Sequence, residues 1–336
     1  MGERPVVVLA MAPVLTAGMI APEDLERLRV VCEVPDPEPL ERLDEARAVD
    51  LLGRCSILLT GWGCPLLDES VLERAPGLRA VVHAAGTVKN LVTPACFERG
   101  VRVSSAAAAN ALPVAEYTLA AILFAGKRVF SLQRRYAQVR NFRLWPAEFP
   151  GLGNLGKVVG IVGASRVGRR VMELLRLFDF QVLLHDPTLS ESDARALGVE
   201  SVELDDLLCR SDIVSLHAPS LPETRHMLDD RRLALMRDGA VLINTARGAL
   251  VDGEALEREL VSGRLEAVID TTEPELLAED SPLYELPNVF LTPHVAGAMG
   301  TETRRMADLA IGEIERLVRG EPLEHEIRAQ DLGRIA

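Results

Sequence analysis

Short apolar runs alternate with amphipathic stretches along the first hundred residues. The apolar runs are VVVLAM (6–11), SILLTG (56–61), RAVVHAAG (79–86) and VRVSSA (101–106). Between them lie stretches rich in Glu, Arg and Leu, such as PEDLERLR and DESVLERAP. This alternation is typical of strands and helices that follow one another, and it predicts a parallel sheet covered by helices.

A second series of apolar runs occupies the later part of the chain. It consists of KVVGIVGA (157–164), QVLLHD (181–186), DIVSLHA (212–218), AVLINTA (240–246), LEAVID (265–270) and NVFLTPH (288–294). The apolar residues are continuous rather than alternating, which is typical of strands buried on both faces. Their spacing of roughly 20 to 30 residues suits right-handed crossovers, so a second parallel sheet is predicted.

Three further segments shape the expected domains. Residues 112–136 predict one long helix, whose first half is apolar almost all round and is therefore expected to be buried. Residues 141–154 hold two prolines and two glycines and predict an irregular loop. A last helix is expected near 301–319, and because it follows the second sheet we expect it to return to the first domain. Its apolar face is expected to hold Met306, Ala310, Ile314 and Leu317.

The composition excludes several classes of protein. With 336 residues, 48% hydrophobic and 26% charged, the chain is globular rather than disordered or fibrous, and its length suggests two domains. A formal net charge of −13 opposes nucleic acid binding, which needs a basic surface, so no nucleic acid partner is expected.

The cysteines, histidines and apolar runs add three negative expectations. Five scattered cysteines without CxxC spacing argue against disulfides and a zinc site and favour a reducing, cytoplasmic compartment. Six histidines without an HExxH-type pair predict no metal. No apolar run approaches the roughly 20 residues of a membrane helix, so no membrane contact is expected. Glu3 and Pro13 interrupt the apolar start, which we interpret as a first strand rather than a signal peptide.

A glycine-containing turn follows the first strand of the second series and opens a helix. It reads Gly163, Ala164, Ser165, Arg166, Val167 and Gly168. In a dinucleotide fingerprint the first glycine makes the tight turn, the last lets helix and strand pack closely, and the helix N-terminus faces the pyrophosphate. Ser165 stands in place of the middle glycine, where its β-carbon can crowd the phosphate or its hydroxyl can donate to it. Taken alone, the motif also fits a turn without a ligand.

Asp186 ends the next strand, 18 residues beyond Gly168. A carboxylate at this place receives the ribose hydroxyls of NAD and repels the additional phosphate of NADP. The alternative is a turn residue before Pro187. The order of strand, loop, helix, strand and acid predicts NAD rather than NADP as the cofactor.

Three polar residues follow later strand ends, where ligands bind in parallel α/β sheets. Arg247 could bind a substrate carboxylate and polarise the adjacent carbonyl, and His294 could donate the proton as hydride arrives. Glu275 could pair with His294 and favour its charged form. Each also has an ordinary alternative: a surface residue at a helix start, a solvated acid, or a loop histidine. Only their joint placement favours the catalytic interpretation.

With these residues in place, the chain resembles the D-isomer-specific 2-hydroxyacid dehydrogenase family, which includes glyoxylate/hydroxypyruvate reductases and phosphoglycerate dehydrogenase. The similarity extends from about residue 50 to 318. The matching segments are NALPVAEYTLA (110–120), HAPSLPETRHML (217–228), MRDGAVLINTARGALVDGEAL (236–256), AVIDTTEPE (267–275) and LPNVFLTPHVAG (286–297).

The resemblance implies an α/β fold in which a Rossmann-type NAD-binding domain, 112–299, is inserted into a split flavodoxin-like substrate domain, 1–111 and 300–336. It implies Arg247, Glu275 and His294 as the catalytic set, D stereochemistry and a homodimer. It places Thr245, Ala246 and Asp270 at the nicotinamide end. Other expected cofactor contacts are Ala218, Thr224 and Gly297, and expected substrate contacts are Ala85, Gly86, Thr87 and Arg247.

The expected substrate loop departs from the family pattern Gly-x-Gly-x-Asp. Here Ala85 and Thr87 occupy the glycine positions and Lys89 occupies the aspartate position. The substrate is therefore left open beyond a small 2-keto or 2-hydroxy acid. His83 and Lys89 could bind an additional anionic group or be solvated, and we favour solvation for Lys89.

Two other functions compete with an NAD-dependent oxidoreductase. Formate dehydrogenases resemble this family but carry Gln where Glu275 stands, which disfavours that activity. An NAD-sensing binding protein, similar to dehydrogenase-like transcriptional corepressors, would keep much of the site without turnover. No basic tail or peptide-binding feature supports that alternative.

Overall fold

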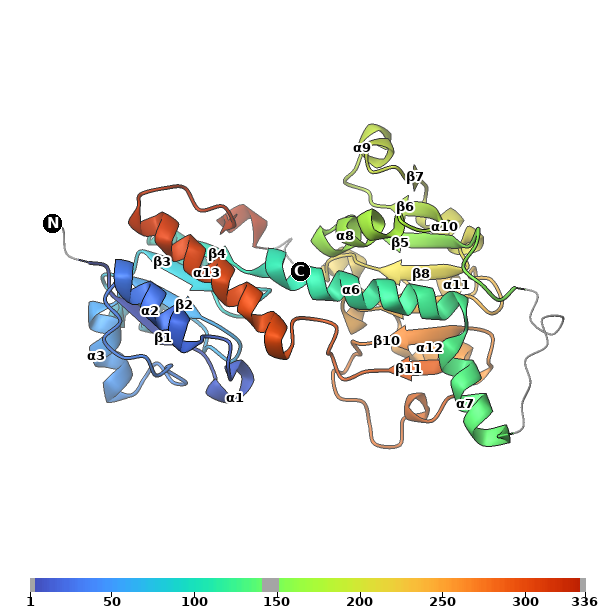
Figure 1. Cartoon of the computed structure of the whole chain (residues 1–336), viewed down its shortest axis with the longest axis horizontal. Coiled ribbons are helices and arrows are strands. Elements are labelled where there is room, and N and C mark those ends of the chain that lie inside the picture. Colours follow the sequence, from blue (N-terminus) through green and yellow to red (C-terminus); the bar gives the residue numbers. More distant parts are fainter. Residues whose placement is uncertain (1–3, 141–150, 333–336) are drawn as a thin grey trace. The chain divides into compact units, whose positions relative to one another are not determined.

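The computed structural model describes residues 4–140 and 151–332. The chain divides into two compact units, one formed by Met1–Asn110 with Ala298–Ala336 and the other by Ala111–Gly297 (Figure 1). Most of the irregular loop expected at 141–154 lies outside the described residues. Each unit has its own sheet and its own hydrophobic core, so each is described by itself.

The first unit is built on a five-stranded sheet in the order β1-β2-β3-β4-β12. The strands are β1 (Val7–Ala10), β2 (Ile57–Thr60), β3 (Ala80–His83), β4 (Arg102–Ser105) and β12 (Glu326–Ile327). The first four are parallel, and β12 is antiparallel to β4. Parallel bridges from Val6 to Glu33 and from Ala10 to Leu40 place the segment between the first two strands beside β1. Counted as a strand, that segment gives the parallel strands the 2-1-3-4-5 order of flavodoxin-like sheets.

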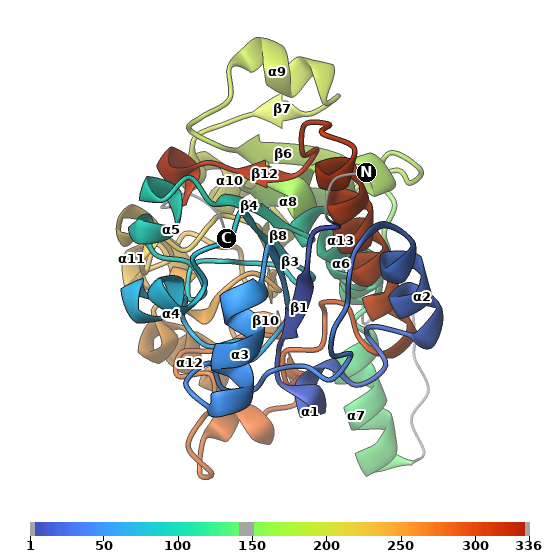
Figure 2. The same cartoon turned by 90° about the vertical axis from the view of Figure 1, so that its left-hand side faces the viewer.

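Helices cover both faces of this sheet. Figure 2 shows α2 (Pro22–Val31) and α13 (Thr303–Val318) on one side and α3 (Ala46–Arg54), α4 (Glu69–Arg74) and α5 (Pro94–Glu98) on the other. A short helix α1 (Pro13–Thr16) follows β1. Met306, Ala310 and Ile314 of α13 are completely buried in the core of this unit. The last helix therefore packs in the core of the first unit.

The second unit contains a seven-stranded, entirely parallel sheet in the order β11-β10-β9-β8-β5-β6-β7. Its strands are β5 (Val158–Val162), β6 (Gln181–His185), β7 (Glu200–Ser201), β8 (Ile213–Leu216), β9 (Val241–Asn244), β10 (Glu266–Ile269) and β11 (Val289–Leu291). This is the Rossmann order, in which the strand sequence reverses between β5 and β8. The ten strands expected from apolar runs all form, each shorter than its run.

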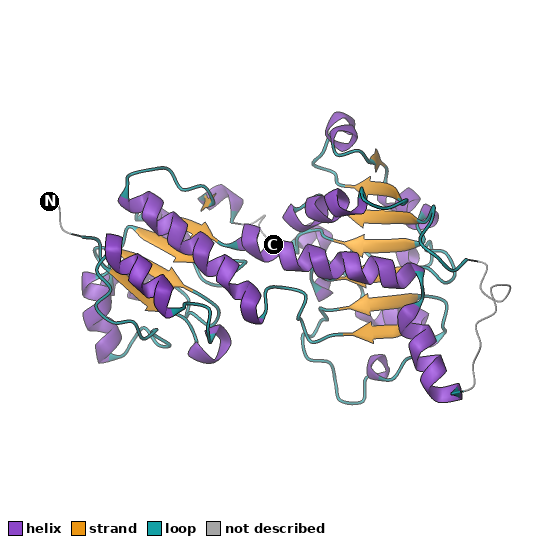
Figure 3. Ribbon diagram, viewed as in Figure 1, coloured by secondary structure: helices purple, strands orange, loops and turns teal. Residues whose placement is uncertain are grey.

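Helices lie on both faces of this sheet as well (Figure 3). They are α6 (Ala107–Gly126), α7 (Val129–Val139), α8 (Arg166–Leu175), α9 (Glu191–Ala196), α10 (Leu204–Arg210), α11 (Asp230–Leu233) and α12 (Gly253–Val261). Ala115 and Ile122 of α6 pack with Met172 of α8 in one core cluster. Leu207 of α10 and Leu256 of α12 belong to a second cluster.

The expectation of one helix over 112–136 is wrong. The segment forms α6 and α7, and Arg128 between them has a left-handed φ of 50°. The break has a packing reason at Gly126. A β-carbon there would lie 1.9 Å from Oδ1 of Asn154, so the helix ends where a distant loop approaches its backbone.

Helix α6 also corrects the expectation that no apolar segment approaches the length of a membrane helix. Its 20 residues are long and apolar enough to cross a bilayer by length and composition. Core helices of soluble proteins meet the same criterion, and the buried residues of α6 pack against the Rossmann sheet. We interpret α6 as a core helix for that reason.

Candidate active site

The carboxyl ends of the strands in the second unit lie at one edge of its sheet, because all seven strands are parallel. Every cofactor or catalytic residue expected in this unit comes after a strand at that edge. These residues are Gly163–Gly168 after β5, Asp186 after β6, Ala218 and Thr224 after β8, Thr245–Arg247 after β9, Asp270 and Glu275 after β10, and His294 and Gly297 after β11.

The turn between β5 and α8 accepts only glycine at its two ends. Gly163 has a φ of 98°, and a β-carbon there would lie 2.6 Å from the backbone nitrogen of Ala218. A β-carbon at Gly168 would lie 2.1 Å from the Gly163 carbonyl oxygen. The turn therefore holds the start of α8 directly against β5, which is the geometry that presents a helix N-terminus to a pyrophosphate. These residues fit a bound dinucleotide.

Ser165 is the N-cap of α8. Its Oγ accepts a hydrogen bond of 3.3 Å from the backbone N–H of Gly168. As an acceptor in this bond the hydroxyl keeps its own proton, so it can still donate to a phosphate oxygen. The side chain thus takes a capping role that the sequence reading did not include.

Asp186 faces the same turn from the end of β6. Its Oδ2 accepts from the Ala164 N–H at 2.6 Å, and its Oδ1 accepts from the N–H and hydroxyl of Thr188 at 2.9 and 2.6 Å. Partial burial raises the pKa of Asp186, but these hydrogen bonds outweigh burial and leave its pKa below the ordinary value. Asp186 therefore makes a turn with Thr188 and also presents a charged carboxylate beside the turn between β5 and α8.

His294 and Glu275 form a direct pair. Nδ1 of His294 lies 2.6 Å from Oε1 of Glu275. The side chains are 47% and 60% exposed, so the pair faces solvent in this unit. With Nδ1 held by the carboxylate, Nε2 is the ring nitrogen that can exchange a proton with a ligand.

Asp270 fixes the loop that carries His294. Its Oδ1 accepts from the Thr292 hydroxyl at 2.6 Å and from the Val295 N–H at 2.8 Å, and its Oδ2 accepts from the Ala296 N–H at 3.0 Å. Its carbonyl oxygen accepts from the His294 N–H at 2.9 Å. Asp270 is only 2% exposed. The resemblance places this residue at the nicotinamide end, and the structure shows that it also anchors the His294 loop.

Arg247 is half-buried in the loop after β9. Its Nη1 donates to the Ala246 carbonyl at 2.6 Å, and its own carbonyl accepts from the side-chain amide of Asn244 at 2.9 Å. Burial lowers the pKa of Arg247, while the charge of Glu275 acts in the opposite direction. The guanidinium therefore lies within electrostatic reach of Glu275 and is not a fully solvated surface residue.

Gly248 brings the loops after β9 and β10 together. A β-carbon at Gly248 would lie 2.1 Å from the carbonyl carbon of Thr272. The Thr272 hydroxyl donates to the carbonyl oxygen of Glu275 at 3.0 Å. Because Arg247 precedes this contact and Glu275 follows it closely, the backbone packing accounts for the proximity of the two charges.

The other residues expected to bind the cofactor make packing or hydrogen-bonding contacts within the second unit. Ala218 is buried, and its backbone nitrogen is the atom closest to a β-carbon at Gly163. Thr224 donates to the Pro219 carbonyl at 2.6 Å and so closes its own loop. Thr245 lies 3.0 Å from the Thr118 hydroxyl, oxygen to oxygen. Gly297 is half-buried at the end of the second unit.

The expected substrate residues belong to the first unit. They follow β3, where Ala85 is buried and Gly86 and Thr87 are half-buried. The Thr87 hydroxyl accepts from the Lys89 N–H at 3.3 Å, and Lys89 is half-buried.

His83 corrects a sequence-based expectation. It was expected either to bind an anion or to be solvated, but it is only 4% exposed, and its Nδ1 lies 2.9 Å from Oγ1 of Thr60. Burial lowers the pKa of His83 to about 4, so the ring is neutral at pH 7. The reason is its position as the last residue of a strand that is paired on both sides, with β2 and with β4. His83 therefore supplies no positive charge.

The sequence reading missed a supporting contact from α6. Tyr117 Oη lies 2.7 Å from Oγ1 of Thr292, the same hydroxyl that donates to Asp270. Burial raises the pKa of Tyr117, so its hydroxyl is neutral at pH 7. The signal available was the segment NALPVAEYTLA, which was noted only for its resemblance.

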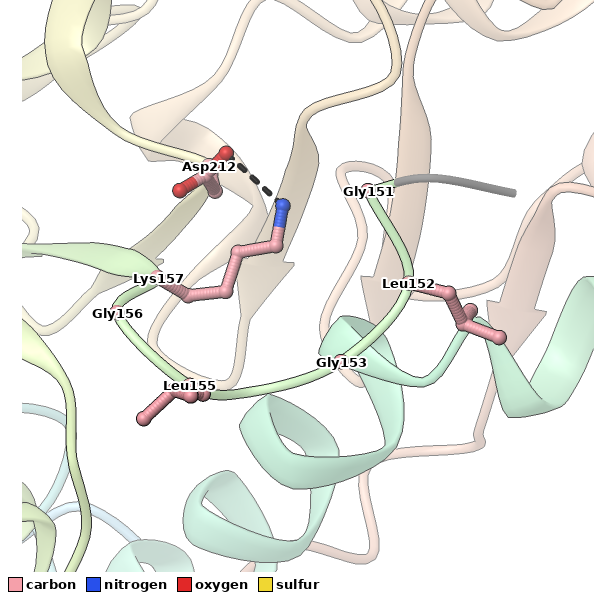
Figure 4. Close-up of a pocket in the computed structure, with 7 residues that line it drawn as sticks. All are labelled: Gly151, Leu152, Gly153, Leu155, Gly156, Lys157 and Asp212. Carbon is pink, nitrogen blue, oxygen red and sulfur yellow. Dashed lines mark hydrogen bonds and ion pairs between the residues drawn. The ribbon is translucent and has the colours of Figure 1, made fainter. Parts of the chain in front are cut away.

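No group of three or more His, Cys, Asp or Glu residues able to hold a metal lies together in residues 4–140 and 151–332. A groove shown in Figure 4 lies at the opposite, amino-terminal edge of the second sheet. It is lined by Gly151, Leu152, Gly153, Leu155 and Gly156 together with Lys157 and Asp212, and Nζ of Lys157 lies 3.1 Å from Oδ1 of Asp212. None of the candidate site residues lines this groove.

Comparisons with known proteins agree with this geometry. A family model described as "D-isomer specific 2-hydroxyacid dehydrogenase, NAD binding domain" matches residues 119–296. The D-3-phosphoglycerate dehydrogenase of Mycobacterium tuberculosis is 36% identical over 254 residues, which is 75% of this chain and 47% of that protein. The glyoxylate reductase of Aeropyrum pernix is 34% identical over 312 residues, 90% of this chain and 91% of that protein. The chain thus spans about half the length of the phosphoglycerate dehydrogenases that it matches.

Solved structures give the same result. A protein from Thermus thermophilus superposes with a TM-score of 0.76 at 32% identity and covers 96% of this chain and 100% of its own. The D-lactate dehydrogenase of Aquifex aeolicus, complexed with NAD and lactic acid, superposes with a TM-score of 0.71 at 26% identity, covering 94% of this chain and 96% of its own.

The close approach at Gly168 gives a first prediction. Gly168→Ala places a methyl group against the Gly163 carbonyl, so α8 must move away from β5. We expect the free energy of unfolding to fall by about 1–3 kcal/mol and the affinity for NADH to fall at least tenfold. Chemical denaturation and fluorescence titration with NADH measure the two effects.

The matched control is Gly53→Ala on α3, where a β-carbon meets nothing within 4 Å. We expect this change to raise the free energy of unfolding by about 0.5–1 kcal/mol and leave NADH binding unchanged. If Gly168→Ala bound NADH as tightly as the wild type, the turn would not be the cofactor site.

Proposed function

The chain belongs to the D-isomer-specific 2-hydroxyacid dehydrogenase family, and on this premise we propose that it is an NAD-dependent oxidoreductase that interconverts a small 2-keto acid and its D-2-hydroxy acid. The observation that carries the proposal is the 2.6 Å contact between His294 Nδ1 and Glu275 Oε1, with the Arg247 guanidinium within electrostatic reach. The D configuration is proposed from family membership alone.

His294 is the proposed acid and base. NAD(H), when bound, supplies or accepts the hydride at the substrate carbon. During reduction, charged His294 gives the Nε2 proton to the carbonyl oxygen, and during oxidation neutral His294 takes the hydroxyl proton at the same atom. Glu275 stabilises the charged ring and holds its orientation through Nδ1.

Arg247 is proposed to bind the substrate carboxylate and to polarise the carbonyl. One of its N–H groups donates to the Ala246 carbonyl, which leaves donors for a two-point contact with a carboxylate. Burial lowers the pKa of Arg247. The ordinary pKa of arginine lies so far above 7 that the guanidinium remains charged at pH 7. A partly buried cation is less screened by salt than a surface cation, which strengthens its hold on an anionic substrate.

NAD is the cofactor that the Rossmann unit fits. We propose that Gly163, Ser165 and Gly168 form the pyrophosphate site, with further contacts from Arg166 and Val167, and that the carboxylate of Asp186 binds the ribose. A charged Asp186 disfavours the additional phosphate of NADP.

The backbone of Ala85, Gly86 and Thr87 is the proposed contact to the substrate in the first unit. The neutral, buried His83 removes one of the two cations that could have bound an additional anionic group. The chain also matches the Aeropyrum pernix glyoxylate reductase over 91% of its length. Both observations support a short, unphosphorylated 2-keto acid as substrate.

An NAD-binding regulatory protein without turnover is the alternative function, and no observation favours it. A panel of 2-keto acids offered with NADH distinguishes the two functions. Steady oxidation of NADH with one of these acids supports the enzyme, and NADH binding without turnover on the whole panel would exclude it.

A homodimer is the proposed assembly. Helix α7 has no buried residue and projects from its unit (Figure 1). Phe124 on α6 and Tyr136 and Val139 on α7 expose large apolar side chains. We propose that a second copy of the chain covers this face.

Replacing His294 tests the chemical step. In His294→Ala, we expect kcat on the true substrate to fall by about 10²- to 10⁴-fold, because the proton donor is lost. The dissociation constant for NADH should stay within twofold of the wild type. Steady-state kinetics and NADH titration measure these values, with His325→Ala in the first unit as the control. Unchanged turnover in His294→Ala would remove His294 from the mechanism.

Replacing Asp186 tests the choice of cofactor. In Asp186→Ala, we expect the ratio of kcat/KM for NADH over NADPH to fall at least tenfold, because the ribose loses its acceptor and the phosphate loses a repulsive charge. Asp179→Ala, at the other end of β6, should leave the ratio unchanged. A ratio unaffected by Asp186→Ala would contradict the ribose assignment.

Placing a charge on α7 tests the assembly. We expect light scattering to report a dimer for the wild type and a monomer for Tyr136→Glu, because burying an unpaired carboxylate at the contact is costly. Leu177→Glu, on the exposed segment after α8, should remain dimeric. A monomeric wild type would refute the proposed contact.

A further inference from the structure

Three loop segments lie side by side at the carboxyl ends of β8, β9 and β10. The backbone N–H of His226 donates to the Ala249 carbonyl at 2.8 Å, and that of Leu228 donates to the Leu250 carbonyl at 3.1 Å. On its other side, the segment after β9 packs against the segment after β10, where Gly248 meets the backbone of Thr272. The middle segment contains Arg247, and the last one contains Glu275.

Side chains join the segment after β8 to the segment after β10, on either side of the segment after β9. Nη1 of Arg225 lies 2.8 Å from Oε1 of Glu273, and Nε2 of His226 lies 3.5 Å from Oε2 of the same carboxylate. The hydrogen bond from Arg225 lowers the pKa of Glu273 below its ordinary value, so the carboxylate is charged at pH 7. Glu273 is two residues before Glu275 in the same loop.

We propose that Arg225 and Glu273 form a clamp that positions Glu275 against His294. The proposal rests on the proposed function of the His294–Glu275 pair and adds two positioning residues to it. An exposed ion pair contributes little to folding, so global stability does not explain a bridge of this kind. Its effect is local, because Glu275 is exposed and a displacement of about 1 Å removes its contact with His294.

The contacts around Glu275 support this role. The Thr272 hydroxyl donates to the carbonyls of Pro274 and Glu275 at 2.8 and 3.0 Å, so residues 272–275 form one compact turn. Within that turn, the ion pair with Arg225 ties Glu273 to the loop after β8. A shift of Glu273 is therefore passed through the turn to Glu275.

The sign of one change distinguishes the clamp from a simple charge effect. In Arg225→Gln, a loosened turn lets Glu275 move away, so the charged form of His294 is less stable and its titration midpoint falls. If Arg225 acted only through its field, loss of a positive charge would raise that midpoint. NMR titration of the His294 ring in the protein without added ligands measures it, with His226→Asn and His294→Asn used to assign the two signals.

We expect the midpoint in Arg225→Gln to fall by at least half of the drop caused by Glu275→Gln, and kcat to fall about three- to tenfold with KM within twofold. The matched control is Arg258→Gln, which breaks an exposed ion pair of α12 with Asp230, also 2.8 Å long, and should change neither value. The double change Arg225→Glu with Glu273→Arg restores the bridge with reversed charges and should return both values toward the wild type.

Each outcome bears on the clamp separately from the function. An unchanged or raised midpoint in Arg225→Gln, or no recovery in the charge-reversed protein, would overturn the clamp. If Arg225→Gln does not fold, Arg225→Met, which also removes only the positive charge, and the charge-reversed protein carry the same test. If none of the 2-keto acids supported NADH oxidation by the wild type, the proposed function would be refuted. The titration would still test the clamp in that case.

Discussion

Parallel hydrogen bonding between neighbouring strands is the constraint on which the site depends. In the second unit, Ile269 pairs with Asn244 on one side and with Leu291 on the other. Neighbouring strands lie about 4.8 Å apart, so the loops that follow β9, β10 and β11 start within two strand spacings of one another. Glu275 and His294 are distant in sequence and meet because their loops leave the sheet at one edge, where the loop of Arg247 also leaves it.

The backbone conformation of His294 is a second constraint on the site. His294 has a left-handed φ of 54°, a conformation that costs about 1–2 kcal/mol for a residue other than glycine. Asp270 offsets this cost by accepting three hydrogen bonds from the loop through its carboxylate and one from His294 through its carbonyl. Burying the carboxylate is tolerated because its charge is met by these donors. The acid at the end of β10 thus fixes the loop in which His294 lies.

The sequence was sufficient for features that depend on local pattern. Apolar runs predicted ten strands, and their alternation with helices predicted parallel sheets, whereas the Rossmann-type domain was implied by the family resemblance. The two-residue strands β7 and β12 carry no pattern and were missed. The break between α6 and α7 depends on the approach of Asn154 to Gly126, which no local pattern reports. His83 was misread because its polarity suggested a ligand contact, whereas the strand register places it beside Thr60 inside the sheet.

In the candidate site, too, some residues could be identified from local sequence pattern and others could not. The residue types and strand ends were enough to single out Arg247, Glu275 and His294. The supports could not be found in this way, because Asp270, Tyr117 and Thr292 come from three elements and their hydrogen bonds exist only in the folded chain. Resemblance placed Asp270 near the cofactor but did not indicate that it holds the loop of His294.

The charge of the chain finally explains why the site needs partly buried groups. A net charge of −13 repels an anionic acid and an anionic cofactor at long range. Binding must therefore come from short-range contacts that salt and the overall field affect little. The Arg247 guanidinium, half-buried against its own loop, and the start of α8, held against β5 by Gly163 and Gly168, are the two such contacts that we propose. An exposed acid such as Glu275 can remain near them because it is paired with a protonatable group of this chain.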